Sequence, residues 1–223
     1  MRITLPSGTP AELATPDGAP ARGVALAPDI MGLRPLFDEH CARLAKEHGW
    51  AVCAPEPFPG QESLPIDERL NGTIDVDRII GDLVAAADAT GAERVAVLGF
   101  CMGGMAAFRA AGWPVQRASG ATSRFDRAVA FYGMVTPPPQ WAAAGKDPLD
   151  MLGKPDACPT LAIVAGQDRW APEDDVAALR ALDDVTVAFY PDADHGFVHD
   201  PSRPVHRADD AADAWRRVGE FLA

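Results

Sequence analysis

A strand that turns into a helix around a single cysteine constrains this chain more than any other feature. Residues 94–98 form a short apolar, β-branched run that leads into Gly-Phe-Cys-Met-Gly-Gly, and residues 105–111 favour helix. Gly99 and Gly103 lie two residues before and after Cys101, where a tight turn leaves little room for a Cβ atom. The pattern predicts a thiol exposed at the carboxyl end of a strand and at a helix N-terminus.

A thiol in that position is suited to nucleophilic chemistry. The unpaired N–H groups and the positive dipole end of a helix favour a thiolate and can bind an oxyanion. Free cysteines are also among the most buried residue types, so an inert cysteine in a glycine-rich turn is the alternative. Glycine-flanked turns serve phosphate binding and purely structural roles as well. The rest of the chain has to decide between these interpretations.

Apolar runs alternate with amphipathic stretches along most of the chain. Such alternation predicts a mostly parallel central sheet flanked by helices on both faces, in one α/β domain over residues 1–223. Strands are expected at 23–27, 50–54, 94–98, 128–133, 160–166 and 185–190, and helices at 36–48, 74–90, 105–111, 172–182 and 208–222.

Four stretches depart from this alternation. Residues 1–28 resemble short strands joined by turns and end in the first buried strand. Residues 55–71 carry five prolines or glycines and predict an irregular surface loop. A polar link is expected around 119–123. Residues 137–155 are interrupted by prolines, and they form either a lid over a pocket or a solvated crossover loop.

Composition narrows the classes of partner. The 223 residues are 48% hydrophobic, which is ample for a core, and they carry 20 basic against 32 acidic side chains for a net charge of −12. An acidic chain without a run of Lys or Arg is not expected to bind nucleic acid or an anionic membrane. No apolar run reaches the length of a membrane span, and the N-terminus lacks a signal-peptide core, so we expect a cytoplasmic protein.

The cysteines agree with a reducing compartment. Cys41, Cys53, Cys101 and Cys158 are scattered without a C-x-x-C spacing. We therefore expect reduced thiols, with neither a disulfide framework nor a zinc site.

An acid and a histidine follow later strands of the predicted sheet. Asp168 lies in the loop after 160–166, and His195 lies in the loop after 185–190. Loops at the carboxyl ends of parallel strands converge, so both side chains should meet Cys101. A lone loop histidine is usually solvated, and a lone Asp before a helix often caps it. Their joint order of nucleophile, acid and histidine is that of α/β-hydrolases, and it predicts a catalytic triad.

Four motifs together resemble the dienelactone hydrolase family of α/β-hydrolases. They are the glycine-flanked Cys101, the Gly-Gln-Asp that ends at Asp168 with a proline four residues later, the His-Gly-Phe that starts at His195, and Pro-Asp-Ile-Met-Gly at 28–32. The resemblance covers nearly the whole chain from Gly23 onward, and the cysteine-centred turn is its most specific part. It implies an α/β-hydrolase fold and a small ester or lactone as substrate.

The resemblance also implies roles for individual residues. Cys101 would be the nucleophile, His195 the base and Asp168 its orienting acid, with an oxyanion hole from the backbone N–H groups of Met102 and Ile30. The residue after a nucleophile on such a turn starts the helix, so its N–H is free to stabilise the alkoxide formed on attack.

Substrate-side positions depart from the family pattern. Family members carry Glu where this chain has Asp29, and that Glu is thought to hold or activate the thiol; Asp29 is either such a thiol-gating group or a turn residue. Members that cleave dienelactone use two arginines for the substrate carboxylate, and the matching positions here are His199 and Asn71. Arg69 lies close to the second position, and Arg169 flanks the catalytic Asp. The departures argue against dienelactone as the substrate without arguing against hydrolysis.

Four aromatic residues stand in or beside the strand-end loops. They either line an apolar pocket or pack its rim, and they are Phe100, Tyr132, Trp170 and Phe197. The remaining histidines, His40, His48 and His206, have no second ligand at metal spacing and are expected at the surface.

We expect a hydrolase that cleaves a small carboxylic ester or lactone through a Cys-His-Asp triad and a covalent acyl-enzyme, without a metal or organic cofactor. Its partner would be a small-molecule substrate, and the sequence is compatible with a monomer or a homodimer. A thioesterase or acyl transferase on the same fold is one alternative. A non-catalytic binding or redox-sensing protein that uses Cys101 is the other, although an oriented base would serve no purpose there.

Overall fold

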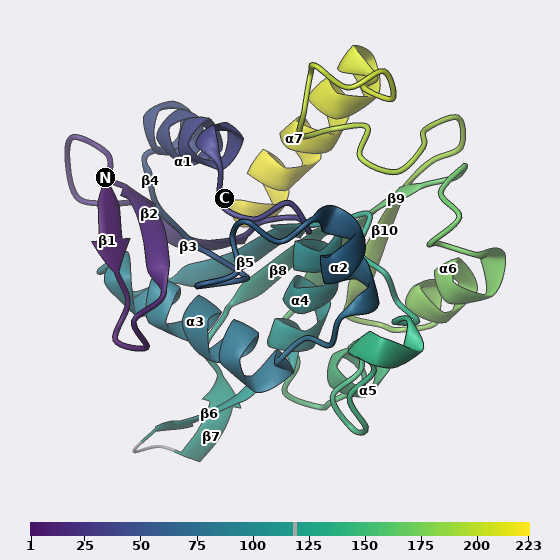
Figure 1. The fold of residues 1–223 in the computed structure, drawn as a ribbon, viewed down its shortest axis with the longest axis horizontal. Helices are drawn as coiled ribbons and strands as arrows, with labels where there is room; N and C mark the ends of the chain where they lie inside the picture. The colour runs from purple at the N-terminus through teal and green to yellow at the C-terminus, as the bar shows by residue number, and fades with distance from the viewer. Residues whose placement is uncertain (118–119) are drawn as a thin grey trace.

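The computed structural model describes residues 1–117 and 120–223, and within them the main sheet has eight strands (Figure 1). β1 and β2 join the sheet antiparallel beside β4, and all the other neighbouring strands are parallel. Their order across the sheet is β1 (Arg2–Thr4), β2 (Pro10–Ala14), β4 (Trp50–Pro55), β3 (Arg22–Ala27), β5 (Val95–Phe100), β8 (Arg127–Phe131), β9 (Thr160–Ala165) and β10 (Val185–Tyr190).

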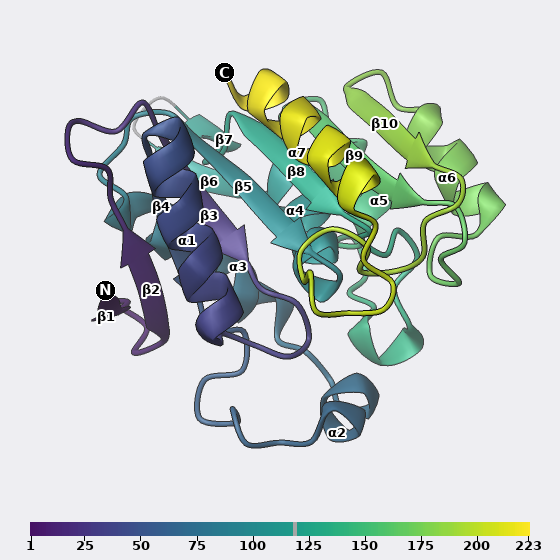
Figure 2. The ribbon, with the colours of Figure 1, turned by 90° about the horizontal axis from the view of Figure 1, so that it is seen from above.

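Helices cover both faces of this sheet. One face carries α1 (Pro35–His48) and α7 (Ala208–Leu222), which Figures 1 and 2 show side by side. The other carries α3 (Val76–Ala89), α4 (Met102–Ala111) and α6 (Glu173–Arg180). The predicted α/β architecture with a mostly parallel, doubly covered sheet is therefore confirmed.

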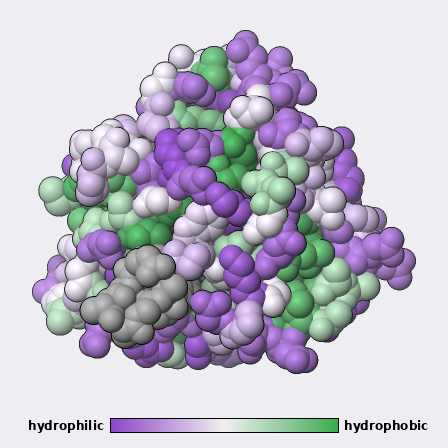
Figure 3. Space-filling model, turned by 90° about the horizontal axis from the view of Figure 1, so that it is seen from below, coloured by the Kyte–Doolittle hydropathy of each residue, from purple (hydrophilic) through white to green (hydrophobic). Residues whose placement is uncertain are grey.

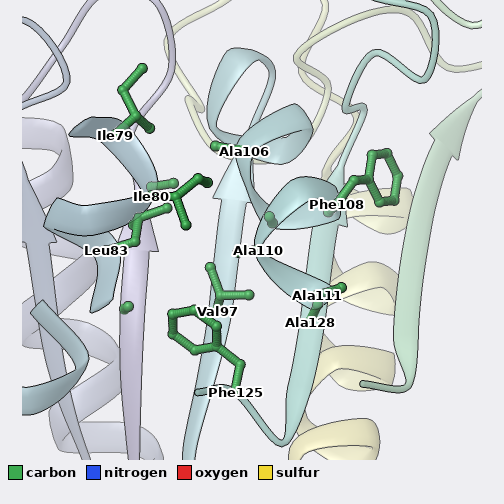
Figure 4. Packing of buried hydrophobic residues seen from close by; sticks show 14 of the residues in the cluster. Ile79, Ile80, Leu83, Val97, Ala106, Phe108, Ala110, Ala111, Phe125 and Ala128 are labelled. Atoms are coloured by element: carbon green, nitrogen blue, oxygen red, sulfur yellow. The ribbon is translucent and has the colours of Figure 1, made fainter. Parts of the chain in front are cut away.

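The central strand β5 shows why the strands are nearly continuous apolar runs. All six of its residues are buried, and they alternate between two separate cores. Val95 and Val97 point toward α3 and α4, where Figure 4 shows Val97 among side chains of both helices. Leu98 and Phe100 point the other way, toward the side chains of α1 and α7. Because both faces of a parallel sheet are covered, no polar alternation is needed.

Short elements fall in the segments expected to be irregular. The predicted loop at 55–71 ends in α2 (Ile66–Asn71), so that prediction is wrong for its last six residues. The 137–155 insertion contains a 3₁₀ turn, η1 (Pro139–Trp141), and α5 (Pro148–Leu152), which Asp147 caps. A side-chain cap and a proline in the first turn suffice to start so short a helix, although the periodicity of the sequence does not reveal it.

The polar link predicted at 119–123 is also corrected. β6 (Pro114–Arg117) pairs antiparallel with β7 (Gly120–Ser123) in a second, two-stranded sheet. Ser119 lies outside the described residues. The hairpin projects from the end of the main sheet (Figure 1).

Hydrophilic residues are spread over much of the face seen from below, between scattered apolar groups (Figure 3). Among the helices of the described residues, none is both long enough and apolar enough to span a bilayer.

Candidate active site

Cys101 occupies a strained turn between β5 and α4. Its φ is 57° and its ψ is −117°, a conformation that non-glycine residues rarely adopt. A Cβ atom on Gly99 would lie 2.0 Å from the Gly103 carbonyl oxygen, and one on Gly103 would lie 2.1 Å from the Ala27 carbonyl oxygen. The turn is pinned to the neighbouring strand, because the Cys101 N–H donates to the Phe131 carbonyl at 3.0 Å. The predicted steric need for both glycines is confirmed.

Accessibility separates Cys101 from the other three cysteines. Cys101 is partly exposed at the start of α4, whereas Cys41, Cys53 and Cys158 are buried. Burial raises the pKa of Cys53 to about 12 and that of Cys41 further still. Among the four thiols, Cys101 is thus the one that a substrate can reach.

His195 and Asp168 meet beside this thiol. The His195 Nδ1 lies 2.6 Å from the Asp168 Oδ2, and a further hydrogen bond joins the His195 ring to the Cys101 side chain. Asp168 is buried, and its Oδ1 accepts the Trp170 N–H at 2.9 Å, so the carboxylate is held on both oxygens. The structure therefore brings the three predicted residues together in a chain from acid to histidine to thiol.

The surroundings of His195 favour its charged form. Burial lowers its pKa, but the hydrogen bonds to Asp168 and Cys101 outweigh this and raise the pKa to about 10. His195 therefore holds its proton at neutral pH, and its side chain is one-fifth exposed, which leaves it open to solvent and substrate.

Two backbone donors lie beside the turn. Met102 is the first residue of α4, where a helix leaves its N–H without an intrahelical partner. Ile30 follows β3 in the loop that packs on α4, as the contacts of Ala27 and Pro28 with Gly103 show. Within the described residues, neither the Met102 nor the Ile30 N–H donates a hydrogen bond. Ile30 and Cys101 pack against one apolar cluster that includes Met102.

A second carboxylate and histidine lie in the interior behind these residues. The His199 Nε2 is 2.8 Å from the Asp29 Oδ2, and the His199 Nδ1 forms a hydrogen bond with the Tyr132 hydroxyl. Arg34 donates to both oxygens of Asp29, at 2.7 and 2.9 Å. Asp29, Tyr132 and His199 are all buried. No polar side chain in this chain of contacts is left unpaired.

The charge state of Asp29 follows from those partners. Burial raises its pKa, but the hydrogen bonds from His199 and Arg34 outweigh burial and lower the pKa to about 2. The carboxylate is therefore ionised at neutral pH, with its oxygens committed to Arg34, His199 and the Met31 N–H. The hypothesis that Asp29 gates the Cys101 thiol stays a prediction.

A pocket of about 270 Å³ opens at Cys101. Apolar side chains from several loops make up most of its wall, and polar ones stand among them. The lining residues are Asp67, Leu70, Asn71, Cys101, Met134, Pro138, Gln140, Trp141, Arg169 and Trp170.

Of the four aromatic residues predicted to line or rim the pocket, one lines it and three are buried in the core. Trp170 lines the pocket, whereas Phe100, Tyr132 and Phe197 are buried in the core shared with α1 and α7. Phe100 stacks on Phe131 with ring centroids 4.6 Å apart, beneath the turn. Three of these residues therefore support the site from below. Strand-end position alone cannot tell which way a ring points.

Other positions differ from the sequence prediction. Trp141 and Met134 line the pocket, although the sequence analysis did not identify them as pocket residues. For Trp141, its position in the proline-interrupted insertion could have indicated this role. His40 was expected at the surface but is buried, and its Nε2 contacts the His199 carbonyl at 2.8 Å. Burial lowers the pKa of His40 to about 4.

Neither His199 nor Arg69 stands in the pocket. His199 is buried in the core. Arg69 is also buried, and its guanidinium donates to the backbone carbonyls of Ile30, Gln61 and Glu62. Asn71 and Arg169, in contrast, do line the pocket.

A model of the dienelactone hydrolase family matches residues 9–223. The chain belongs to this family. The match covers nearly the whole chain, as the four sequence motifs predicted, and the chain is a hydrolase of the dienelactone hydrolase type.

Individual relatives are moderately similar. A protein of Methylorubrum extorquens, provisionally named carboxymethylenebutenolidase, is 29% identical over 247 residues, which cover 100% of this chain and 79% of that protein. The crystal structure of a provisionally named dienelactone hydrolase from Klebsiella pneumoniae superposes with a TM-score of 0.82 at 24% identity, covering 100% of this chain and 97% of the other.

A third similar protein carries a different activity in its name. It is a dienelactone hydrolase-like promiscuous phosphotriesterase from metagenomic libraries, with a TM-score of 0.70, 20% identity, and coverage of 100% of this chain and 96% of the other. At such identities the two solved structures establish the α/β-hydrolase fold and nothing more specific.

Proposed function

We propose that this protein hydrolyses small carboxylic esters or lactones through a triad of Cys101, His195 and Asp168. The observation that carries the proposal is the position of His195, which bonds to a buried carboxylate on one side and to an accessible, strained cysteine on the other. A redox sensor or a binding protein would gain nothing from such an oriented histidine.

The first step of the proposed reaction transfers the acyl group of the substrate to Cys101. In the proposed step the proton resides on His195, the Cys101 sulfur attacks the ester carbonyl carbon, and the carbonyl electrons move to oxygen. The N–H groups of Met102 and Ile30 stabilise that oxyanion. When the intermediate collapses, the carbon–oxygen bond breaks, and His195 gives its proton to the departing alkoxide. The products of this step are an alcohol, or the freed hydroxyl end of a lactone, and a thioester on Cys101.

Deacylation reverses the role of His195. The now neutral imidazole takes a proton from water, and the resulting hydroxide attacks the thioester carbonyl. Collapse breaks the carbon–sulfur bond, releases the carboxylic acid, and restores the free Cys101 sulfur and the protonated histidine. Asp168, whose Oδ2 lies 2.6 Å from the His195 Nδ1, fixes the ring and stabilises the imidazolium. Only Cys101 and His195 change their bonding or protonation during the cycle, and both return to their starting state.

The pocket suits a substrate with an apolar acyl or alcohol group. Trp141, Trp170 and Met134 line it beside Cys101. Neither arginine position of dienelactone-cleaving relatives is filled by arginine, because Asn71 and His199 stand there and His199 is buried. We therefore propose an ester or lactone other than dienelactone.

We also propose that residues 1–223 act as one domain. The sheet extends from β1 to β10, and the last helix, α7, packs into the same apolar core as α1.

The experiment that tests the function is turnover of chromogenic esters of increasing acyl length and of small lactones. Wild-type chain should hydrolyse at least one of them. Cys101→Ala should lose turnover, and mass spectrometry should detect a covalent acyl group on the peptide that contains Cys101 in the wild type alone. Cys53→Ala is the matched control, since it removes a buried thiol, and it should retain turnover. Equal turnover by Cys101→Ala would refute the triad.

A further inference from the structure

One wall of the pocket is the short helix α2. Asp67, Leu70 and Asn71 of this helix line the pocket at Cys101. α2 stands at the end of a long connection, away from the body of the sheet (Figure 2). Side chains of the 137–155 insertion hold its carbonyls, with the Gln140 Nε2 2.8 Å from the Leu70 oxygen and the Trp141 Nε1 3.0 Å from the Gly72 oxygen.

The fourth residue of α2, Arg69, faces the opposite way. It is the buried residue of this helix, at 5% exposure. Its guanidinium donates to the Ile30 carbonyl at 3.0 Å and to the carbonyls of Gln61 and Glu62. The charge lies over the ring of Phe58, with 5.0 Å between the guanidinium carbon and the ring centroid. A buried charge is costly unless it is bonded in this way, so the position of the side chain is well defined.

The three N–H groups that follow Ile30 in the turn that receives Arg69 are all bonded. The Met31 N–H donates to the Asp29 Oδ1 at 2.9 Å, and the Gly32 N–H donates to the Asp29 carbonyl at 3.0 Å. The Leu33 N–H donates to a Glu56 carboxylate oxygen at 2.8 Å. Within the described residues, the Ile30 N–H donates no hydrogen bond, whereas the three N–H groups that follow it all do.

Side chains pack closely against this turn at Gly32. Gly32 has a φ of +80°, and a Cβ atom there would lie 2.9 Å from a Glu56 oxygen and 3.3 Å from the Arg69 Nη1. Arg69 and Glu56 are thus packed directly against the backbone that carries the free donor.

We propose that Arg69 is a positioning residue that holds the Ile30 N–H in place for the oxyanion and ties it to the α2 wall of the pocket. The inference rests on the proposed hydrolysis. The hydrogen bond from Arg69 holds the peptide unit that follows Ile30, and the Gly32 N–H holds the preceding unit through the Asp29 carbonyl. The Ile30 N–H belongs to that preceding unit, so the two bonds together restrict the backbone on both sides of Ile30 and with it the direction of the N–H. An oxyanion donor acts through its fixed placement, and the loss of one donor costs about 10²- to 10³-fold in kcat in comparable enzymes.

The test compares Arg69→Met with Arg69→Lys on a chromogenic ester that the wild type hydrolyses. Arg69→Met should lower kcat by about 10- to 100-fold while KM changes less than about threefold, because the loss concerns the transition state. Arg69→Lys keeps one donor that can reach the Ile30 carbonyl, and it should recover part of the kcat. The pH profile should keep its shape, since the triad is untouched.

Alkylation of Cys101 by iodoacetamide is the second readout. That reaction displaces iodide and forms no carbonyl oxyanion, so Arg69→Met should alkylate at the wild-type rate within about twofold. Arg78→Met is the matched control. Arg78 donates to the Pro57 carbonyl at 2.6 Å and anchors the same connection without reaching the turn, and its loss should leave kcat nearly unchanged. If Arg69→Met does not fold, Arg69→Leu, which also lacks a donor, gives the same kcat test.

The outcomes separate this inference from the function it rests on. Absence of turnover by the wild type overturns both. Wild-type turnover with an unchanged kcat in Arg69→Met overturns the inference alone, as does an effect confined to KM, which would make Arg69 part of substrate binding. A parallel loss of alkylation would show that the site has collapsed, and would also overturn it.

Discussion

Two carboxylate–histidine pairs of nearly equal length lie close together in this molecule, and their surroundings differ. The Asp168–His195 contact is 2.6 Å long and the Asp29–His199 contact is 2.8 Å. The side chain of His195 is 20% exposed and its remaining hydrogen bond goes to Cys101, whereas that of His199 is 2% exposed and bonds to Tyr132. One pair ends at a reactive thiol, and the other ends in the core.

The difference teaches that the second partner of the imidazole, more than the first, decides what the pair can do. His195 is bonded to a group whose proton can be exchanged with a substrate. His199 is bonded to a phenol whose pKa is raised by burial and by the nearby Cys101 and Asp29, so its proton stays in place. Arg34 forms an ion pair with Asp29, which compensates the buried carboxylate of the interior pair. We therefore expect the first pair to control rate and the second to control stability.

The largest expected effect is on catalysis at the exposed pair. Asp168→Asn should lower kcat/KM by about 10²- to 10⁴-fold, because the imidazole loses its orienting charge. Asp29→Asn should change kcat/KM by less than about tenfold. The measurement is steady-state ester hydrolysis by both variants. Comparable losses in the two would break the distinction between the pairs.

Asp29→Asn should have the larger effect on folding. Removing one partner of a buried ion pair leaves Arg34 and His199 uncompensated, and we expect a loss of about 3 kcal/mol in the free energy of unfolding. Urea denaturation at pH 7 measures it, and the double variant Asp29→Asn/Arg34→Met should lose less than the sum of the single losses. Additive losses would show that the two residues do not act together.

The stability contributions of the two pairs should disappear at opposite ends of the pH range. The pKa of His195 is raised above its unfolded value of 6.5, so its contribution is complete below pH 6.5 and is lost as the pH rises toward 10. The pKa of Asp29 is lowered from 3.8, so its contribution is complete above that value and is lost as the pH falls toward 2. Melting temperatures of His195→Gln and Asp29→Asn across pH 3 to 10 test this. His195→Gln should flatten the alkaline side of the curve of melting temperature against pH, and Asp29→Asn should flatten its acid side. If both variants flatten the same side of that curve, the two pairs do not act at opposite ends of the pH range.

A finer test concerns gating of the thiol. Because the oxygens of Asp29 are already bonded, Asp29→Asn should leave the pH profile of Cys101 alkylation unchanged. A displaced profile would show that Asp29 acts on the thiol and would connect the two pairs.

The smallest effect is expected at the phenol. Tyr132→Phe removes one hydrogen bond from His199 and keeps the ring packing, so the free energy of unfolding should fall by about 1 kcal/mol. Catalysis should change less than about threefold. A loss of rate comparable to that of Asp168→Asn would mean that the interior pair takes part in the reaction.

The sequence by itself determined the elements that depend on local pattern. Period and composition are sufficient for the strands, the long helices and the family, and the glycines around Cys101 already imply a turn too tight for side chains, which the distances at Gly99 and Gly103 confirm. The joint order of Cys101, Asp168 and His195 predicted their meeting, because parallel strands present their carboxyl ends to one edge. That meeting is present in the structure.

Tertiary structure alone decided which polar residues share a partner. Nothing local distinguishes His199, buried on Asp29, from a histidine that faces the pocket, and nothing local turns Arg69 toward the Ile30 carbonyl instead of toward a substrate. Such contacts join residues separated by 39 to 170 positions, and they form only because buried charges must find compensating groups wherever the packed chain supplies them.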